Sequence, residues 1–386
     1  MINEGDRMMN ASSTGTTDAS REVVESLARA YEKATQTGQT GQTVGTQHLL
    51  FALLKGESAA ADLLSRSNGG LRAVISAKDD TVWLSGDDDR NDPPAAPAVT
   101  ALLHEAEWVA RRTAKPRDKS ASPESQPMLP SGALVTALGQ MLVSAHDLGV
   151  TWANETHMLM GLLHDPGNRA SEALLERRLD RDELRARLAV HPSAHQNGEP
   201  NMRSVDGLCN LGMLDKPAGR GWGGRIGRLL TSGGFGSPVV PTVRMEAKRQ
   251  TIRLGHSRVT TAHLLLAMLV VDDQLTTAGR RFRDGVAQVN MGAELLRTRG
   301  ATSSAAFNAV ADLIRPGDRP QAGSLALESS AEKALTRARL LAHERKSPST
   351  GTTHLLAAVL ADPDDPCHSL LSAIGVDVEE LRQALG

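Results

Sequence analysis

One short pattern recurs four times along the 386-residue chain and constrains the fold more than any other feature. In each copy a histidine is followed by a run of apolar residues, and a Gly, Asn or Thr stands three residues before the histidine. The four signature histidines are His48, His157, His263 and His354. Similarity at intervals of 91 to 109 residues indicates a repeat architecture, in which each repeat is one small helical motif.

Each histidine opens a predicted helix that is apolar on nearly all sides. Amphipathic helices are predicted before these runs, at 19–37, 132–148, 241–254 and 329–345, and Ser131 and Ser329 are their candidate N-caps. Shorter helices are predicted after them, at 59–67, 170–178, 274–282 and 368–373, and again at 70–76, 182–189, 292–299 and 378–385. A helix that is apolar all round must be buried, and one repeat cannot cover it alone, so we expect the repeats to pair.

The predicted fold is all-α, with two domains that are each a pseudo-twofold pair of repeats. Domain 1 spans 19–190, with repeats at 19–84 and 131–190 around an insertion at 85–130 that holds an extra helix at 99–114. Domain 2 spans 237–386, with repeats at 237–299 and 324–386 joined by a polar, mobile connection. Residues 1–18 are expected to be a disordered N-terminus, and 191–236 to be a Gly-rich linker.

Composition excludes several classes of protein. Aromatic residues make up only 2% of the chain, so Leu, Ala, Val and Met must fill the core, as in helical bundles. The formal charge of −2 is unlike that of a non-specific nucleic-acid binder, although it leaves room for a local basic patch. Cys209 and Cys367 are predicted to be free thiols, and with no signal segment or apolar span the protein is expected in the cytoplasm.

The residues around the histidines resemble the Clp N-terminal repeat family, the all-helical double-repeat domain at the front of unfoldases of the ClpA and ClpC type. The family pattern is a helix ending in Leu-Gly-His, a polar turn, and Gly-Thr-Glu-His before an apolar run. Residues 254–263, Leu-Gly-His-Ser-Arg-Val-Thr-Thr-Ala-His, follow it closely, and 148–157 and 370–377 also match. The resemblance implies docking of substrates, adaptor proteins or small cyclic peptides next to an ATPase motor.

The chain departs from the family at the positions that the resemblance marks for ligand or partner binding. Where some members use the Glu before the histidine to grip phosphorylated arginine, this chain has Gln47, Thr156, Ala262 and Thr353, none of which carries a carboxylate. Glu155 stands one residue earlier and is expected to point elsewhere. The places that match the family's aromatic residue before the first helix hold Pro130 and Leu327.

No pattern in the sequence indicates catalysis, a cofactor or a metal. The sequence has no G-x-x-x-x-G-K-[ST] phosphate loop, no G-x-S-x-G elbow and no H-E-x-x-H motif. One histidine per repeat is too few for zinc, so a capping or packing role at the helix start is favoured. The basic, amphipathic stretch 220–230, which includes Trp222, is either a packed loop or a docking peptide.

The sequence therefore predicts a non-catalytic protein- or peptide-binding protein. Its expected partners are a Clp unfoldase, the unfoldase's substrates or adaptors, or cyclic peptides. It would act as an adaptor, or as a decoy that sequesters antibiotic-like peptides that target the unfoldase. The alternatives are a regulatory protein associated with DNA or another partner, and an enzyme on a helical scaffold.

Overall fold

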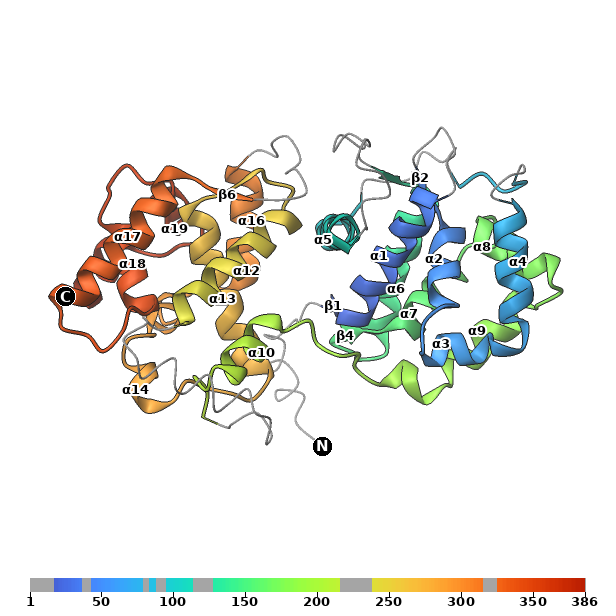
Figure 1. The fold of residues 1–386 in the computed structure, drawn as a ribbon, viewed down its shortest axis with the longest axis horizontal. Coiled ribbons are helices and arrows are strands. Elements are labelled where there is room, and N and C mark those ends of the chain that lie inside the picture. Colours follow the sequence, from blue (N-terminus) through green and yellow to red (C-terminus); the bar gives the residue numbers. More distant parts are fainter. Residues whose placement is uncertain are drawn as a thin grey trace, which may run out of the picture. The chain divides into compact units, whose positions relative to one another are not determined.

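The computed structural model describes residues 17–36, 43–78, 83–87, 95–113, 128–215, 238–314 and 325–385. These residues form an all-α structure, as predicted, in which the few strands are two residues long. The chain divides into two compact units, Met1–Asn201 and Met202–Gly386, called unit 1 and unit 2 below (Figure 1). None of the described helices combines the length and the apolar character that a membrane span requires.

Unit 1 holds the first two repeats and the insertion between them. Its elements are β1 (Asp18–Ala19), α1 (Arg21–Gln36), β2 (Thr43–Val44), α2 (Thr46–Leu53), α3 (Ala59–Leu63), the 3-10 helix η2 (Ser65–Ser67), α4 (Asn68–Lys78), α5 (Pro97–Thr113), β3 (Leu129–Pro130), α6 (Gly132–Asp147), β4 (Trp152–Ala153), α7 (Glu155–Leu162), α8 (Arg169–Glu176), α9 (Arg181–Ala189) and the 3-10 helix η3 (Pro192–His195). All eight residues of α2 are buried, as its apolar sequence requires. It packs against α1 on one side and against α7 and α8 of the second repeat.

Two parallel strand pairs join the repeats of unit 1. β1 of the first repeat pairs with β4 of the second, so that Asp18 lies opposite Trp152. β2 of the first repeat pairs with β3 of the second, so that Val44 lies opposite Pro130. The strand before each repeat's first helix is therefore bonded to the strand before the partner repeat's middle helix, and neither repeat is complete without the other.

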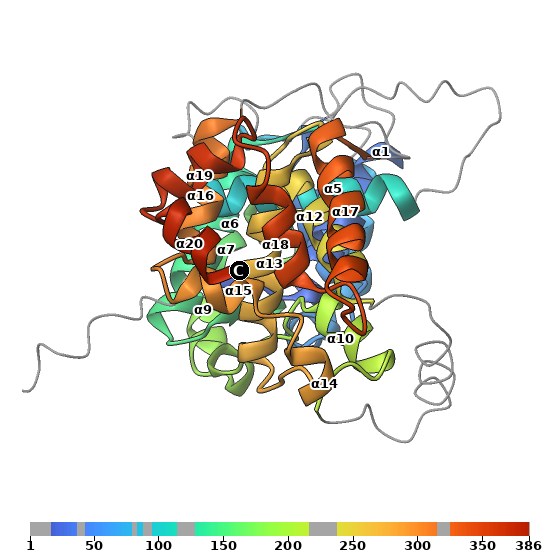
Figure 2. The same cartoon turned by 90° about the vertical axis from the view of Figure 1, so that its left-hand side faces the viewer.

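Unit 2 holds the third and fourth repeats. Its elements are α10 (Arg203–Asn210), α12 (Val239–Arg253), β5 (Arg258–Val259), α13 (Thr261–Thr277), α14 (Asp284–Ala287), α15 (Gly292–Arg297), α16 (Ser303–Leu313), β6 (Ala326–Leu327), α17 (Ser329–Glu344), α18 (Thr352–Leu360), α19 (Cys367–Ala373) and α20 (Val378–Leu385). β5 and β6 pair in parallel, as β2 and β3 do in unit 1. Figure 2, in which unit 2 faces the viewer, shows α18 beside α13 and α17, and all three are in contact.

The starts of α6 and α17 test the two N-cap residues that the sequence predicted. Ser131 caps α6 by accepting a hydrogen bond from the Leu134 N–H at 3.2 Å, which confirms that prediction. Ser329 does not cap α17, because the N-cap is Glu328. The N–H of Glu328 donates to the Val259 carbonyl at 2.8 Å, so strand-like pairing reaches Glu328 and the helix can begin only at the next residue.

The prediction of a Gly-rich linker at 191–236 is wrong for residues 191–215, the part that the structure describes. Residues 192–195 and 203–210 are helical, and they pack within their units: His157 bonds to the Ala194 carbonyl, and Ser204 donates to Glu246. Residues 216–236 of the predicted linker, with the basic stretch 220–230, lie outside the described residues.

Three other segments also differ from the sequence prediction. The connection expected at 300–323 contains α16, whose Ala306 and Val310 are buried one helical turn apart. The separate helix expected at 274–282 is the end of α13, which continues to Thr277. Of the N-terminus expected to be disordered, residues 1–16 lie outside the described part, but Asp18 belongs to β1. Both cysteines are free thiols, as predicted.

Candidate functional site

The starts of the four middle helices, called the helix entrances here, share one hydrogen-bond arrangement. The N-cap residues Gly45, Asn154, Thr260 and Gly351 are all extended, and a signature histidine occupies the third helical position of each helix. In every case the histidine Nδ1 accepts the N-cap N–H, at 3.0 Å for His48 and 3.1 Å for the other three. The imidazole thus replaces the carboxylate of an ordinary capping box.

This arrangement requires neutral histidines with the proton on Nε2, because Nδ1 is an acceptor. His157 Nε2 lies 2.9 Å from the Ala194 carbonyl oxygen, which can only accept. His263 Nε2 lies 2.9 Å from His256 Nδ1, and His354 Nε2 lies 2.9 Å from Ser347 Oγ. Burial lowers the pKa of all four signature histidines, to about 3 for His48 and His263.

The signature histidines therefore hold the backbone at the start of each middle helix. Among the described residues, no group of three or more His, Cys, Asp or Glu side chains could hold a metal ion.

Beside each histidine lies one of the residues that the sequence marked for ligand binding. Gln47, Thr156 and Ala262 are buried, and Thr353 is half-buried. Thr156 Oγ1 lies 2.7 Å from Ser193 Oγ, and Thr353 Oγ1 accepts the Met291 N–H at 3.0 Å. The first three side chains are thus withdrawn from direct contact with a partner in this conformation.

Glu155, in the first position of α7, also points into unit 1. It is buried, accepts a hydrogen bond from Ser26, and pairs with Arg29 at 3.2 Å. Both partners lie on α1, so this carboxylate connects the second repeat to the first. It leaves the entrance of α7 without a free acidic group.

Pro130 and Leu327 occupy equivalent places in the two units, each at the end of a two-residue strand before an amphipathic helix. Pro130 lies opposite Val44, and Leu327 lies opposite Val259. Both side chains are half-buried. The neighbouring Leu129 is 59% exposed and is the feature here that sequence reasoning missed. An apolar residue next to Pro130, after a long polar tract, was the available signal.

Two buried aspartates at the entrances were also missed. Asp87 Oδ2 accepts the Thr46 N–H and the Thr46 hydroxyl, both at 2.8 Å, and Asp87 Oδ1 accepts the Arg169 N–H at 2.8 Å. In unit 2, Asp365 Oδ1 accepts the Thr261 hydroxyl at 2.5 Å and the Cys367 N–H at 2.8 Å. Each aspartate therefore ties the middle helix of one repeat to a helix start in its partner repeat.

The segment that carries Asp87 is fixed to α8 by Glu172. This carboxylate accepts hydrogen bonds from Lys78, from the Ser85 hydroxyl at 2.6 Å and from the Ser85 N–H at 2.8 Å. Burial alone would raise the pKa of Glu172, but these donors outweigh it and lower the pKa to about 2. Residues 83–87 thus form an ordered strap across the two repeats.

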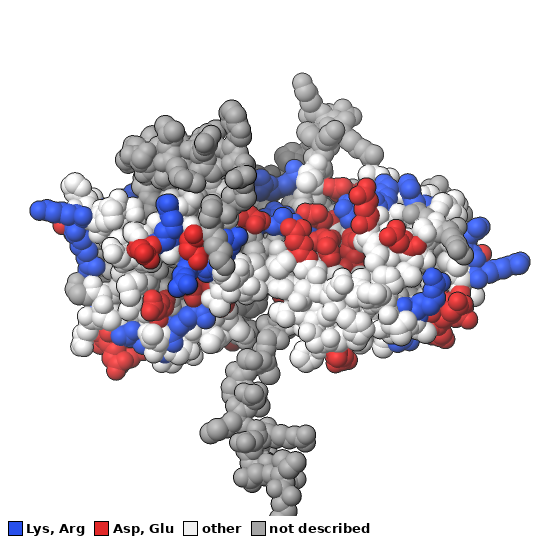
Figure 3. Space-filling model, turned by 90° about the horizontal axis from the view of Figure 1, so that it is seen from below, with Lys and Arg blue, Asp and Glu red and all other residues white. Residues whose placement is uncertain are grey.

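Charged side chains are distributed unevenly over the surface. Figure 3 shows lysines and arginines mixed with acidic residues on the face that it presents, and an uncharged area beside a group of acidic side chains on unit 1.

A comparison with protein families gives one match. Residues 326–386 match the family described as the Clp repeat (R) N-terminal domain. No curated protein matches the chain. The matched segment begins at β6 and contains α17 to α20, with Leu327 and His354 in the places described above. The resemblance to the Clp N-terminal domain family is therefore confirmed for the fourth repeat, and it indicates a Clp-related role in protein interaction.

Proposed function

We propose that the chain is a non-catalytic docking protein built from four Clp repeats, two in each unit. The observation that supports this most strongly is the helix entrance. The fourth repeat, which matches the family, has the same histidine-to-N-cap hydrogen bond as the other three. Parallel strands at equivalent places join the repeats within each unit, as expected of one repeat type used twice.

The docking surface that we propose lies at β3 in unit 1 and at β6 in unit 2. Leu129 and Pro130 offer an apolar edge beside the first turn of α6, and Ala326 and Leu327 hold the same place before α17. An exposed leucine at a strand end is suited to pack into an apolar pocket or under an apolar peptide ring. The buried entrances behind these strands hold them in position.

The partner that we propose is a Clp unfoldase, or a peptide or protein that the unfoldase binds. The docking that we propose would serve a Clp motor in the cytoplasm. An adaptor would bind cargo and unfoldase together. A decoy would bind the peptides, including cyclic antibiotics, that otherwise occupy the unfoldase.

The test is binding of the full chain to a purified Clp unfoldase and to a cyclic peptide that docks on the unfoldase's N-terminal domain. We expect Leu129→Asp to weaken binding at least tenfold, because it places a charge in the apolar contact. The matched control is Val190→Asp, which alters another exposed apolar residue of unit 1. For unit 2, Leu327→Asp is compared with Leu340→Asp on α17.

The two versions of the proposal give different results. An adaptor binds the unfoldase directly, and a decoy binds the cyclic peptide and protects the unfoldase from it. If the wild-type chain binds neither, the proposed function is wrong. Equal losses in the strand variants and their controls would show that the docking surface lies elsewhere.

A further inference from the structure

Three positively charged side chains surround the ring of Phe51 on α2. Lys33 Nζ lies 4.9 Å from the ring centroid, Lys55 Nζ 4.8 Å, and the central guanidinium carbon of Arg72 5.5 Å. These are cation–π distances. The charges come from α1, from the residue pair after α2, and from α4, so the fold brings three separate segments to one ring. Lys33, Phe51, Lys55 and Arg72 are called the Phe51 cluster below.

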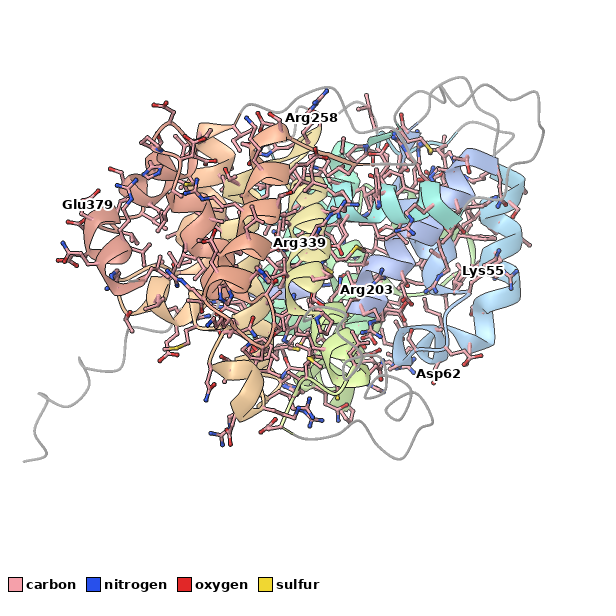
Figure 4. All side chains as sticks on the ribbon, turned by 60° about the vertical axis from the view of Figure 1, so that its left-hand side comes forward. Lys55, Asp62, Arg203, Arg258, Arg339 and Glu379 are labelled. Carbon is pink, nitrogen blue, oxygen red and sulfur yellow. The ribbon has the colours of Figure 1, made fainter. Side chains whose placement is uncertain are left out.

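The positive charge of the Phe51 cluster is concentrated and accessible. Because each charged group lies within 5.5 Å of the same centroid, no two of them are more than about 11 Å apart. Lys55 and Arg72 are exposed, and Figure 4 shows Lys55 at the surface of unit 1. The phenyl ring itself is buried and fixed by the core, so the charges share a rigid base.

Several other cations of unit 1 form ion pairs with carboxylates. Arg29 pairs with Glu155, Lys78 with Glu172 and Glu176, and Arg111 with Glu107. Within the described part of the chain, no carboxylate forms an ion pair with Lys55 or Arg72. Since Lys55 and Arg72 lie within about 11 Å of each other, close to the Debye length of roughly 8 Å in physiological salt, an anion that enters between them is attracted by both.

We propose that the Phe51 cluster docks an acidic segment of a partner protein, bound as an extended chain. Alternate side chains of an extended segment point to the same side and repeat every ~7 Å, which fits charges separated by up to about 11 Å. The net charge of −2 for the whole chain disfavours a long polyanion such as nucleic acid, whereas a short acidic segment experiences mainly the local field. This inference rests on the proposed function and names the chemistry of one partner.

The test uses the full chain and a fluorescein-labelled eight-residue peptide with glutamate at alternate positions, followed by fluorescence anisotropy. A peptide with glutamine in place of glutamate is the matched ligand. We expect the acidic peptide to bind more tightly than the glutamine peptide, and to lose affinity as salt rises from ~50 to ~300 mM. We expect the double variant Lys55→Gln/Arg72→Gln to bind it about tenfold more weakly, since two exposed ion pairs are lost.

The control is the double variant Arg185→Gln/Arg187→Gln, which removes the same charge from exposed positions on α9. It should change the affinity less than twofold. A second variant, Phe51→Leu, keeps an apolar side chain in the core but removes the π face that gathers the cations. It should weaken binding about threefold, with an unchanged circular dichroism spectrum.

Several outcomes would overturn the inference. Equal binding of the two peptides, or an equal loss in the α9 control, would show that the cluster has no specific role. Displacement of the peptide by ~10 mM inorganic phosphate or by a DNA oligonucleotide, but not by free glutamate, would assign the cluster to phosphate groups. If the chain binds the unfoldase normally but does not bind the acidic peptide, the proposal for the Phe51 cluster is wrong and the proposed function stands. If it binds the acidic peptide but not the unfoldase or the cyclic peptide, the proposed function is wrong.

Discussion

The entrance of α2 in unit 1 and the entrance of α13 in unit 2 are each bonded to a buried aspartate, but the aspartate comes from a different part of the chain in each unit. Each helix begins with a threonine, Thr46 or Thr261, whose hydroxyl donates to a buried aspartate. Each aspartate also accepts the first N–H of the third helix of the partner repeat, at Arg169 in α8 or Cys367 in α19. The positive ends of two helices therefore converge on one carboxylate in both units.

The difference lies in where the aspartate comes from. Asp365 stands two residues before α19, inside the fourth repeat. Asp87 stands in the strap between the repeats, and the place that corresponds to Asp365 in the second repeat holds Asn168, which caps α8 instead. The comparison teaches that the repeat pair requires an acceptor at this point in space, and that different parts of the chain can supply it.

The largest effect that we expect is from removing Asp87. The change Asp87→Ala leaves the buried N–H and hydroxyl of Thr46 and the partly buried N–H of Arg169 without their acceptor, and should lower the unfolding free energy of unit 1 by ~3–4 kcal/mol. In unit 2, Asp365→Ala removes fewer donors and should lower it by ~2 kcal/mol. The measurement is urea unfolding of residues 1–201 and 202–386 expressed separately.

Exposed aspartates provide matched controls for both changes. Asp62→Ala in unit 1 and Asp364→Ala in unit 2 should alter stability by less than ~0.5 kcal/mol. If Asp365→Ala costs as much as Asp87→Ala, the number of donors does not set the cost. If neither costs more than its control, the proposed requirement for an acceptor is wrong.

Acid should weaken both units to a similar extent, because each has one entrance histidine with a pKa of about 3. The folded pKa lies below the unfolded value of ~6.5, so the unfolded chain takes up protons first and stability falls as the pH drops from ~6.5 towards 3. Each histidine contributes up to ~1.4 kcal/mol per pH unit, or ~2 kcal/mol between pH 6.5 and 5. Unfolding measured across this range should show the slope in both units.

Removing the titrating group should flatten that slope. We expect His48→Gln and His263→Gln to be less stable near pH 7.5 but less sensitive to acid. His146→Gln and His343→Gln, which change exposed histidines, should retain the wild-type slope. An unaltered slope in the entrance variants would show that other groups cause the acid sensitivity.

The strap gives a smaller effect that is specific to unit 1. Glu172→Gln replaces an acceptor that serves Lys78 and Ser85, and should cost ~1–2 kcal/mol at pH 7. Since the folded pKa of Glu172 is about 2 and the unfolded value is 4.5, its contribution falls as the pH drops from 4.5 towards 2. Glu176→Gln, which affects only the bond to Lys78, should cost less.

The smallest effect that we expect is a gain in unit 2. After α17, Lys346 adopts φ 50°, in the left-handed region, where α6 and α12 have Gly149 and Gly255. Lys346→Gly should therefore raise the stability of unit 2 by ~0.5–1 kcal/mol, since lysine is strained there. Lys346→Ala keeps the strain and should give no gain. Thermal unfolding of the 202–386 fragment distinguishes the two.

The sequence was sufficient to predict the helices of the repeats, because their apolar spacing is regular. The helices predicted at 132–148 and 378–385 agree with α6 and α20 within one residue. It was insufficient for α16, a helix of mixed apolar and polar residues of which only Ala306 and Val310 are buried. That helix depends on contact with α13 and α19, which no local pattern reveals.

The candidate site was less predictable than the fold. Asp87 belongs to a run of three aspartates, and nothing in that run distinguishes the one that is buried. Glu172 opens a stretch with charges of both signs that is typical of an exposed face, yet its carboxylate lies under the strap. The Phe51 cluster unites residues from three helices, so only tertiary packing brings its charges together.

The interlocked strands impose an order of events on the nascent chain. Asp18 can pair only after Trp152, 134 residues later, has been synthesised, and this synthesis takes roughly 7–27 s at ordinary rates of translation. Arg258 can pair only after Ala326 has been synthesised. These two residues are 68 residues apart, about half the first separation, and this synthesis takes roughly 3–14 s. During the longer interval the apolar helix α2 has left the ribosome, but α7 and α8, against which it packs, have not yet been synthesised. We therefore expect ribosome-associated chaperones to protect the N-terminal half for longer than the C-terminal half.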